Sequence, residues 1–254
     1  MPLPQTPSFR LDGRRALVAG ASSGIGRAAA VALAQAGARV TLLARQADNL
    51  VLLQSEMRAE GLEADYLALD ICDTAKMEST LAAQAPYEIL VNSAGLARHS
   101  PALQTIESDY DAVTNVNVKA AYFLTRAGAK SLVGAQRSGS LINVSSQMGL
   151  VGGIDRAVYC ATKHALEGMT KAMAVEWGPH KIRVNTLCPT FTRTPLAEQT
   201  LSIPARRKWI EDQIKLGRIA EVEDLMGAVV FLASDAAAMM TGTSLLIDGG
   251  WTAS

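Results

Sequence analysis

An apolar segment that breaks into a glycine-rich turn constrains the fold of this chain more than any other feature. Residues 16–19 are Ala-Leu-Val-Ala, residues 20–26 are Gly-Ala-Ser-Ser-Gly-Ile-Gly, and a helical pattern follows over residues 27–36. Glycine lets the backbone bend and approach a ligand closely, and the free amides at the start of a helix attract a phosphate. The pattern therefore predicts a strand, a phosphate-binding turn and a helix. The candidate binding residues in the turn are Gly20, Ser22, Ser23, Gly24, Ile25 and Gly26.

Strand and helix patterns continue to alternate along the rest of the chain, which has 254 residues and is 49% hydrophobic. Further strands are expected at residues 39–44, 64–69, 89–91, 140–144, 183–187 and 244–250. Further helices are expected at residues 48–60, 74–84, 108–133, 159–177 and 221–233. This alternation requires a parallel sheet with right-handed crossovers, and the length allows one large core. We therefore expect a single α/β domain over residues 1–254.

Charge and hydropathy argue against several classes of partner. The 24 basic and 24 acidic residues cancel, so the chain has no broad positive surface for nucleic acid. Its apolar stretches are shorter than the about 18 residues that would span a membrane. Residues 1–7 also lack the basic and apolar regions of a signal peptide. We expect a cytoplasmic protein that binds neither nucleic acid nor a membrane.

The spacing of cysteines and histidines argues against a disulfide framework and against a metal site. The cysteines are odd in number, far apart and free of any C-x-x-C pattern, so they are interpreted as small core residues. The histidines show no ligand spacing such as H-E-x-x-H. These residues are Cys72, Cys160, Cys188, His99, His164 and His180.

Three residues that can move or steer a proton lie between positions 146 and 163. Tyr159 and Lys163 are four residues apart in a helical pattern, so their side chains share one helix face. An ammonium near a phenol lowers the phenol's pKa, which makes the pair a candidate proton relay. Ser146 follows an apolar strand pattern, and open α/β sheets bind ligands at the carboxyl ends of their strands. The alternative is that tyrosine and lysine have this spacing by chance.

Ser146 and the sequence Tyr159-x-x-x-Lys163 resemble the signature of the short-chain dehydrogenase/reductase family. The resemblance extends over most of the chain. It implies a doubly wound Rossmann fold and hydride transfer between a nicotinamide cofactor and a carbonyl or secondary alcohol. By this resemblance, Tyr159 exchanges a proton with the substrate oxygen and Ser146 hydrogen-bonds that oxygen. Lys163 lowers the pKa of the phenol and holds the ribose.

Asn117 lies inside the helix expected at residues 108–133, for which Ser108 is a candidate N-cap. Asparagine has a mediocre propensity for helix interiors, so its presence needs an explanation. A neighbouring backbone group could satisfy its side chain. The resemblance instead makes it a catalytic residue that bends the helix and holds a water linking Lys163 to solvent. Asn115 is the rival position.

The resemblance also implies which residues contact the adenosine half of the cofactor. The glycine turn is similar to the family's Thr-Gly-x-x-x-Gly-x-Gly, with Ala19 in place of Thr. Asp70 and Ile71 match the position that contacts adenine, although an aspartate there could equally cap a helix or a turn. A second segment is similar to the family's Asn-Asn-Ala-Gly beside the ribose, with a serine replacing the second Asn. Its residues are Asn92, Ser93, Ala94 and Gly95.

Residues 188–194 resemble the family's Pro-Gly-x-x-x-Thr loop, with Thr190 in place of Gly. In relatives this loop binds the nicotinamide carboxamide, which implies contacts from Pro189, Thr192 and Thr194. A positive φ at Thr190 would be strained. Residues 190–218 contain amphipathic material that we expect to form a mobile lid. The lid has six basic and three acidic residues, so it favours an anionic substrate unless the charges only solvate a helix surface.

The end of the second expected strand indicates which cofactor is used. An NAD-selective site has Asp or Glu about 20 residues beyond the glycine turn, where the carboxylate binds the ribose 2′-hydroxyl. This chain has Ala44 and Arg45 there. A guanidinium could bind a 2′-phosphate, with Ser22 and Ser23 as further donors, so we expect NADP(H) to be preferred over NAD(H). The alternative is a solvated arginine at a strand end.

These patterns predict an oxidoreductase that acts on a small-molecule carbonyl or alcohol. The sequence leaves open a sugar or polyol, a 3-oxoacyl thioester, a steroid or a small ketone. A catalytically silent NAD(P)-binding sensor is the alternative of a different class, although a sensor has no use for a proton relay. The helices expected at 107–133 and 157–177 carry more apolar surface than one sheet face needs, and relatives pair through these helices. We therefore expect a homotetramer or homodimer.

Overall fold

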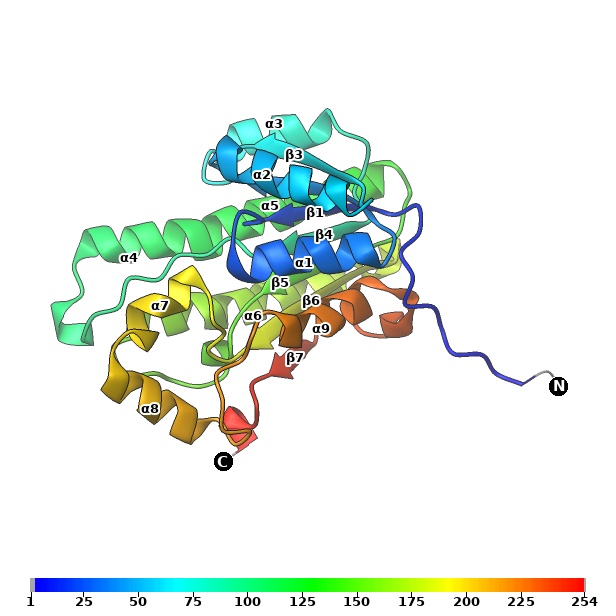
Figure 1. The fold of residues 1–254 in the computed structure, drawn as a ribbon. Helices are drawn as coiled ribbons and strands as arrows, with labels where there is room; N and C mark the ends of the chain where they lie inside the picture. The colour runs from blue at the N-terminus through cyan, green and yellow to red at the C-terminus, as the bar shows by residue number, and fades with distance from the viewer. Residues whose placement is uncertain (1–2, 254) are drawn as a thin grey trace.

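A sheet of seven parallel strands forms the centre of the structure, a computed structural model that describes residues 3–253 (Figure 1). The strands are β1 Arg15–Ala19, β2 Arg39–Ala44, β3 Ala64–Ala68, β4 Ile89–Asn92, β5 Gly139–Val144, β6 Ile182–Pro189 and β7 Ser244–Ile247. Their order is β3-β2-β1-β4-β5-β6-β7, and every neighbouring pair is parallel. The winding reverses between β1 and β4, which confirms the doubly wound Rossmann fold predicted from the sequence.

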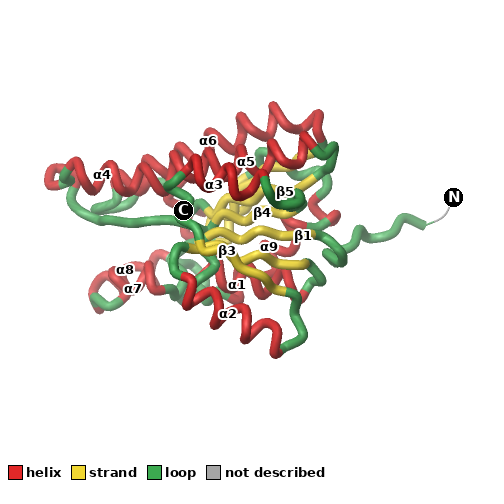
Figure 2. Tube along the Cα trace, turned by 90° about the horizontal axis from the view of Figure 1, so that it is seen from above, coloured by secondary structure: helices red, strands yellow, loops and turns green. Residues whose placement is uncertain are grey.

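Helices cover both faces of the sheet (Figure 2). One layer contains α1 Gly24–Gln35, α2 Ala47–Ala59 and α9 Glu223–Ala233. The other layer contains α3 Thr74–Ala82, α4 Glu107–Thr114, α5 Ala121–Gly134 and α6 Ala157–Trp177. Right-handed crossovers place the helices that connect β1 through β6 in these two layers. The connection from β6 to β7 continues in the same direction across the sheet but carries α9 on the face of α1, so this crossover is left-handed and departs from the expected rule.

The two layers bury two separate apolar clusters against the sheet. Leu17 and Val18 are neighbours in β1 and are both fully buried, yet they belong to different clusters. In β5, the neighbouring residues Leu141 and Ile142 also belong to different clusters. Side chains alternate between the two faces of a strand, so strands covered by helices on both faces need continuous apolar runs. These runs are the patterns from which the strands were predicted.

The helix expected at residues 108–133 is interrupted in the structure. α4 leads into a π-helical segment, Asn115–Ala120, and α5 continues from there. The prediction of Ser108 as the N-cap is wrong, because α4 begins at Glu107 and Ile106 occupies the cap position without a side-chain hydrogen bond. Glu107 and Asp109 place negative charge in the first turn, which favours a helix start through the dipole.

The expected end of the last strand is also wrong. The strand expected to reach residue 250 ends at Ile247, and Gly249 and Gly250 then adopt positive φ angles of 61° and 86°. Such angles leave the extended region that a strand requires. Thr190 does not adopt the positive φ that would have strained it, because positive φ among the non-glycine residues of the described chain is confined to Gln136, Asp155 and Lys181. The other predicted boundaries differ from the observed ones by a few residues, as helix ends commonly do.

The segment expected to form a lid contains two helices outside the layers, α7 Pro195–Leu201 and α8 Pro204–Gln213 (Figure 1). Its basic residues are mostly paired. Arg207 and Lys208 bind Glu211 and Asp212 on α8 itself, at 2.9 Å each. Arg193, Arg206 and Arg218 pair with Glu221, Asp155 and Asp224. The excess positive charge of this segment is therefore largely neutralised and cannot by itself attract an anionic substrate.

The cysteines occupy the kinds of position expected of them. Cys160 and Cys188 are buried, Cys72 is partly buried, and all three are free thiols. Within residues 3–253, no cluster of three or more His, Cys, Asp or Glu is placed to hold a metal ion. No helix in this range is both long enough and apolar enough to cross a membrane.

Candidate active site

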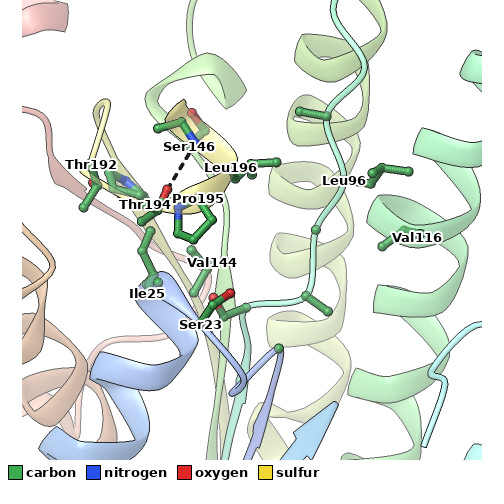
Figure 3. Close-up of a pocket in the computed structure, with 18 of the residues that line it drawn as sticks. Ser23, Ile25, Leu96, Val116, Val144, Ser146, Thr192, Thr194, Pro195 and Leu196 are labelled. Atoms are coloured by element: carbon green, nitrogen blue, oxygen red, sulfur yellow. Dashed lines mark hydrogen bonds between the residues drawn. The ribbon is translucent and has the colours of Figure 1, made fainter. Parts of the chain in front are cut away.

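A cavity of about 420 Å³ opens at the carboxyl ends of the strands, beside the point where the winding reverses. Its walls come from the glycine turn after β1 and from the loops after β2, β3, β4, β5 and β6, together with α6 and α7. Figure 3 shows part of this wall, with Ser23 and Ile25 on the glycine turn facing Thr194 and Pro195. A crevice at this place is where open α/β sheets bind nucleotide ligands.

Most residues predicted from the sequence to form the site line this one cavity. They are Gly20, Ser22, Ser23, Gly24, Ile25, Arg45, Asp70, Ile71, Ala94, Gly95, Ser146, Tyr159, Lys163, Pro189, Thr192 and Thr194. Three predicted residues lie behind the wall instead and do not line it. They are Gly26, Asn92 and Asn117.

The glycine turn requires glycine for steric reasons. Gly20 has a positive φ of 76°, and a Cβ atom there would lie 2.7 Å from the main-chain nitrogen of Ala94. A Cβ atom on Gly26 would lie 2.1 Å from the carbonyl oxygen of Gly20, so Gly26 lets α1 pack against the turn. Ser23 precedes α1 without capping it through its side chain. The helix start therefore keeps amide groups without a side-chain cap at the cavity, as an anion-binding terminus requires.

Lys163 is held at the base of the cavity. Its side chain is 5% exposed, and its Nζ donates a 2.9 Å hydrogen bond to the carbonyl oxygen of Val144, the last residue of β5. Burial lowers the pKa of Lys163 to about 8. The same Nζ lies 5.6 Å from the centre of the Tyr159 ring. The two side chains share one face of α6, as their spacing predicts.

Tyr159 lines the cavity together with Ser146 and carries a transferable phenolic proton. Burial raises the pKa of its phenol, while the hydroxyl of Ser146 and the guanidinium of Arg156 act in the opposite direction. Ser146 follows β5 and accepts a 3.1 Å hydrogen bond from the amide of Met148, which fixes its position. The arrangement joins a transferable proton to a hydroxyl that can bind the same substrate oxygen.

Asn117 is satisfied by neighbouring protein groups. Its Oδ1 accepts from the amide of Leu96 at 2.8 Å, and its Nδ2 donates to the carbonyl of Leu96 at 2.9 Å and to Thr162 Oγ1 at 3.2 Å. Both amide hydrogens are thus used. Asn117 lies in the π-helical segment, so it fastens the bent helix to the loop after β4 and to α6. A water held by this residue would have to use the main chain or the remaining lone pair of Oδ1.

Two predicted cofactor residues have clear structural roles. Asn92 donates to Asn143 Oδ1 at 3.3 Å and accepts from the amide of Ala94 at 3.3 Å, which shapes the loop after β4 from behind. Asp70 lines the cavity, but its Oδ1 also accepts from the amide of Cys72 at 2.9 Å. The turn role considered for Asp70 is therefore present, and it leaves the other carboxylate oxygen available.

Arg45 stands at the end of β2, at the mouth of the cavity. Its side chain is exposed, and among residues 3–253 it forms no ion pair. Ser22 and Ser23 line the same cavity. The guanidinium is therefore free to bind a phosphate on a ligand in the glycine turn.

The loop after β6 places α7 over the glycine turn. Thr194 caps α7, with its Oγ1 accepting from the amide of Ala197 at 3.3 Å. Its methyl group lies 3.0 Å from where a Cβ atom on Gly24 would stand. Figure 3 shows Leu196 extending from α7 toward the side of the cavity that holds Leu96. The start of α7 therefore forms part of the cavity wall next to the glycine turn.

Sequence reasoning missed several lining residues at the end near Tyr159. The side-chain amide of Gln147 is 1% exposed, and neither of its polar atoms has a hydrogen-bond partner in the described chain. His99 packs edge-on to the Tyr159 ring at 5.8 Å, and burial lowers its pKa to about 4. Gln147 directly follows Ser146, and Arg156 lies about one helical turn before Tyr159. These two positions are the features of the sequence that could have identified them as residues of the site.

Comparison with known proteins gives matches along nearly the whole chain. The family model described as enoyl-(acyl carrier protein) reductase matches residues 20–252. D-erythrulose reductase from Gallus gallus is 43% identical, covering 98% of this chain and 99% of that protein. L-xylulose reductase from Bos taurus is 41% identical, covering 96% and 99%. The crystal structure of a gluconate 5-dehydrogenase from Burkholderia cenocepacia J2315, in complex with NADP and tartrate, has a TM-score of 0.93 and 33% identity, covering 97% and 98%.

Proposed function

This chain is an oxidoreductase of the short-chain dehydrogenase/reductase family, and from that premise we propose that it transfers a hydride between NADP(H) and a sugar, polyol or sugar acid. The observation that carries the proposal is the meeting of Ser146, Tyr159 and Lys163 with the glycine turn in one cavity. The relatives named above act on erythrulose, xylulose and gluconate according to their names, which favours a polyhydroxylated substrate over a 3-oxoacyl thioester. As an enzyme, the chain is not a silent sensor.

The residues of the cavity fit a dinucleotide. Cβ atoms at Gly20 and Gly26 would collide with the backbone, so the turn is as tight as a pyrophosphate cradle requires. Arg45, Ser22 and Ser23 line the cavity and would bind a 2′-phosphate, and Asp70 with Ile71 would bind the adenine. Pro189, Thr192 and Thr194 line the opposite end, where the nicotinamide would lie. When bound, the cofactor supplies or accepts the hydride.

In the proposed mechanism, Tyr159 donates its phenolic proton to the substrate carbonyl oxygen during reduction and accepts a proton from the alcohol during oxidation. Ser146 hydrogen-bonds the same oxygen and stabilises the charge that develops there. Lys163, held through Val144, supplies a positive charge beneath the Tyr159 ring. Asn117 completes the set by fixing the loop of Leu96 and by supporting the water relay expected from the family.

The test is cofactor consumption at the nicotinamide absorbance band with NADPH and a panel of carbonyl compounds. The panel contains ketoses, oxo-aldonic acids, a 3-oxoacyl thioester, a steroid ketone and a small ketone. We expect ketoses or oxo-aldonic acids to give the highest kcat/KM. A thioester that exceeds them by tenfold or more would refute the proposed substrate class.

We also propose that the chain assembles as a homotetramer or homodimer through α4, α5 and α6. Apolar or aromatic side chains on these helices remain exposed, with Tyr110 at 50%, Tyr122 at 42% and Val175 at 80%. Burying such side chains between copies would remove apolar area from water. Light scattering should give two or four times the 26.8 kDa of one chain. A mass equal to one chain at micromolar concentration would contradict the proposal.

The segment of α7 and α8 is proposed to act as a lid that admits substrate and cofactor. It lies outside the helical layers and covers the cavity through Pro195 and Leu196. A cytoplasmic location is also proposed, and the three free thiols are compatible with a reducing compartment.

A further inference from the structure

A guanidinium without an acidic partner lies at the substrate end of the cavity. Arg156 directly precedes α6 and lines the cavity with Tyr159 and Ser146. Its side chain is partly buried, and none of the ion pairs among residues 3–253 includes it. A charged side chain that is partly removed from water normally pairs with an opposite charge. An arginine without such a partner is therefore unusual.

Neutral groups hold the guanidinium in place. One terminal nitrogen contacts the ring of His99, and the other donates to Thr200 Oγ1 at 3.0 Å. The guanidinium carbon lies 4.9 Å above the centre of the Phe191 ring. The low pKa of His99, about 4, keeps that ring uncharged at neutral pH, so none of the three contacts neutralises Arg156.

The nearest carboxylate is already engaged. Asp155 precedes Arg156 in sequence, but it pairs with Arg206 of α8 at 3.0 Å. Asp70 is the sole acidic residue among those lining the cavity, and it lies at the opposite, β3 end. The substrate end therefore has a net positive charge.

Helix geometry places this charge beside the reacting atoms. Arg156 is the N-cap residue of α6, three residues before Tyr159, and Tyr159 and Lys163 share one face of that helix. Burial raises the pKa of the Tyr159 phenol, and the charge of Arg156 opposes that rise, which requires that the two groups be close. The buried, unpartnered amide of Gln147 also lines this end and offers a further donor and acceptor.

We propose that Arg156 binds a carboxylate of the substrate, so that the enzyme selects sugar acids over neutral sugars and polyols. The inference rests on the proposed function, because it names the substrate class of the same site. A carboxylate would pair with the guanidinium of Arg156 through charge-assisted hydrogen bonds, which a neutral hydroxymethyl group cannot form. The reacting carbon of a polyhydroxy acid would then lie beside Ser146 and Tyr159, a few bonds from the anchored carboxylate.

The experiment compares two probes that differ only at the groups in question, tartrate and threitol. Threitol carries hydroxymethyl groups where tartrate carries carboxylates. Calorimetric titration of each into the protein saturated with NADP⁺ measures affinity independently of turnover. We expect tartrate to bind at least about tenfold more tightly than threitol, as charge-assisted hydrogen bonds allow. Equal affinities, or tighter binding of threitol, would overturn the inference.

Two substitutions then locate the effect. Arg156→Gln should weaken tartrate binding by about ten- to a hundredfold and change threitol binding by less than about threefold. Lys208→Gln, which removes a lid cation that is paired with Asp212, should change neither. If Arg156→Gln weakens both probes equally, Arg156 only braces Thr200 and the lid, and the inference is wrong.

Two further measurements distinguish a failure of the inference from a failure of the proposed function or of folding. If Arg156→Gln fails to fold, Arg156→Lys takes its place, because lysine keeps the charge and loses the planar fork. Tartrate should then bind more weakly to this variant than to the parent, while threitol binding stays within about threefold. An affinity for tartrate equal to that of the parent would contradict a bidentate contact. If the unmodified protein prefers tartrate but reduces no carbonyl with NADPH, the proposed function fails while the anion site stands. If the unmodified protein reduces neutral ketoses as efficiently as their acid analogues, the proposed function stands and the inference fails.

Discussion

Replacement of Tyr159 by Phe is expected to lower kcat by about 10²–10⁴-fold, the usual contribution of general acid–base catalysis. The change removes the only proton that the phenol can transfer and leaves the ring in its place between Lys163 and His99. The affinity for NADP(H) should stay within about threefold of the parent value, because the phenol's proton is not part of the phosphate-binding turn. Single-turnover rates and cofactor titrations measure the two quantities separately.

Tyr122→Phe is the matched control for this substitution. Tyr122 lies on α5 and is 42% exposed, so loss of its hydroxyl should leave kcat unchanged. Both variants should unfold at temperatures close to that of the parent. If the Tyr159 variant retains turnover within a few-fold of the parent, Tyr159 is not the acid–base residue.

The combination of Ala44→Asp with Arg45→Ala is expected to shift the ratio of kcat/KM for NADPH over NADH toward NADH by about a hundredfold. The arginine change removes charge-assisted hydrogen bonds to the 2′-phosphate, which are worth about 1.5–3 kcal/mol. The new aspartate accepts from the ribose 2′-hydroxyl and repels the phosphate. Initial rates at varied concentrations of each cofactor give the ratio.

Arg39→Ala provides the control for cofactor preference. Arg39 begins β2 at its far end from the cavity and pairs on the surface with Glu63 at 3.1 Å. Its loss should leave the ratio of the two cofactors unchanged. A parent enzyme that uses NADH better than NADPH would show that Arg45 is only a surface charge.

The topology could be predicted from the sequence because local patterns and global fold agree in this chain. Apolar runs such as residues 89–91 are buried on both faces of a parallel sheet, and this requirement alone distinguishes them from amphipathic helices. The π-helical interruption at Asn117 could not be placed in this way. It depends on hydrogen bonds to Leu96 and Thr162, which only the folded chain brings together.

The residues of the site also divide into those that local sequence patterns predict and those that depend on distant partners. Gly20, Ser146, Tyr159 and Lys163 could be predicted because each follows a strand or occupies a helix face at a fixed spacing. The roles of other residues depend on distant partners. Arg156 can be recognised as unpaired only once Asp155 is seen to pair with Arg206, fifty-one residues further along the chain.

The basic lid shows that charges counted along the sequence can be paired in the folded chain. Its six positive charges indicated an anionic substrate when counted along the sequence, but five of them form ion pairs on the protein surface. Exposed pairs of this kind contribute little to stability and little to a distant site. Charge counted over a segment therefore predicts less about binding than one unpaired charge inside a cavity.

Transfer of deuterium from NADPH that carries deuterium at both hydrogen positions of C4 of the nicotinamide tests the central claim most directly. The enzyme is incubated with this cofactor and the best carbonyl substrate of the panel, and the product is examined by mass spectrometry and NMR. The account predicts one deuterium on the newly formed carbinol carbon for each cofactor oxidised, and loss of this transfer in the Tyr159→Phe variant. Product formed without deuterium at that carbon, or no product from any carbonyl in the panel, would contradict it.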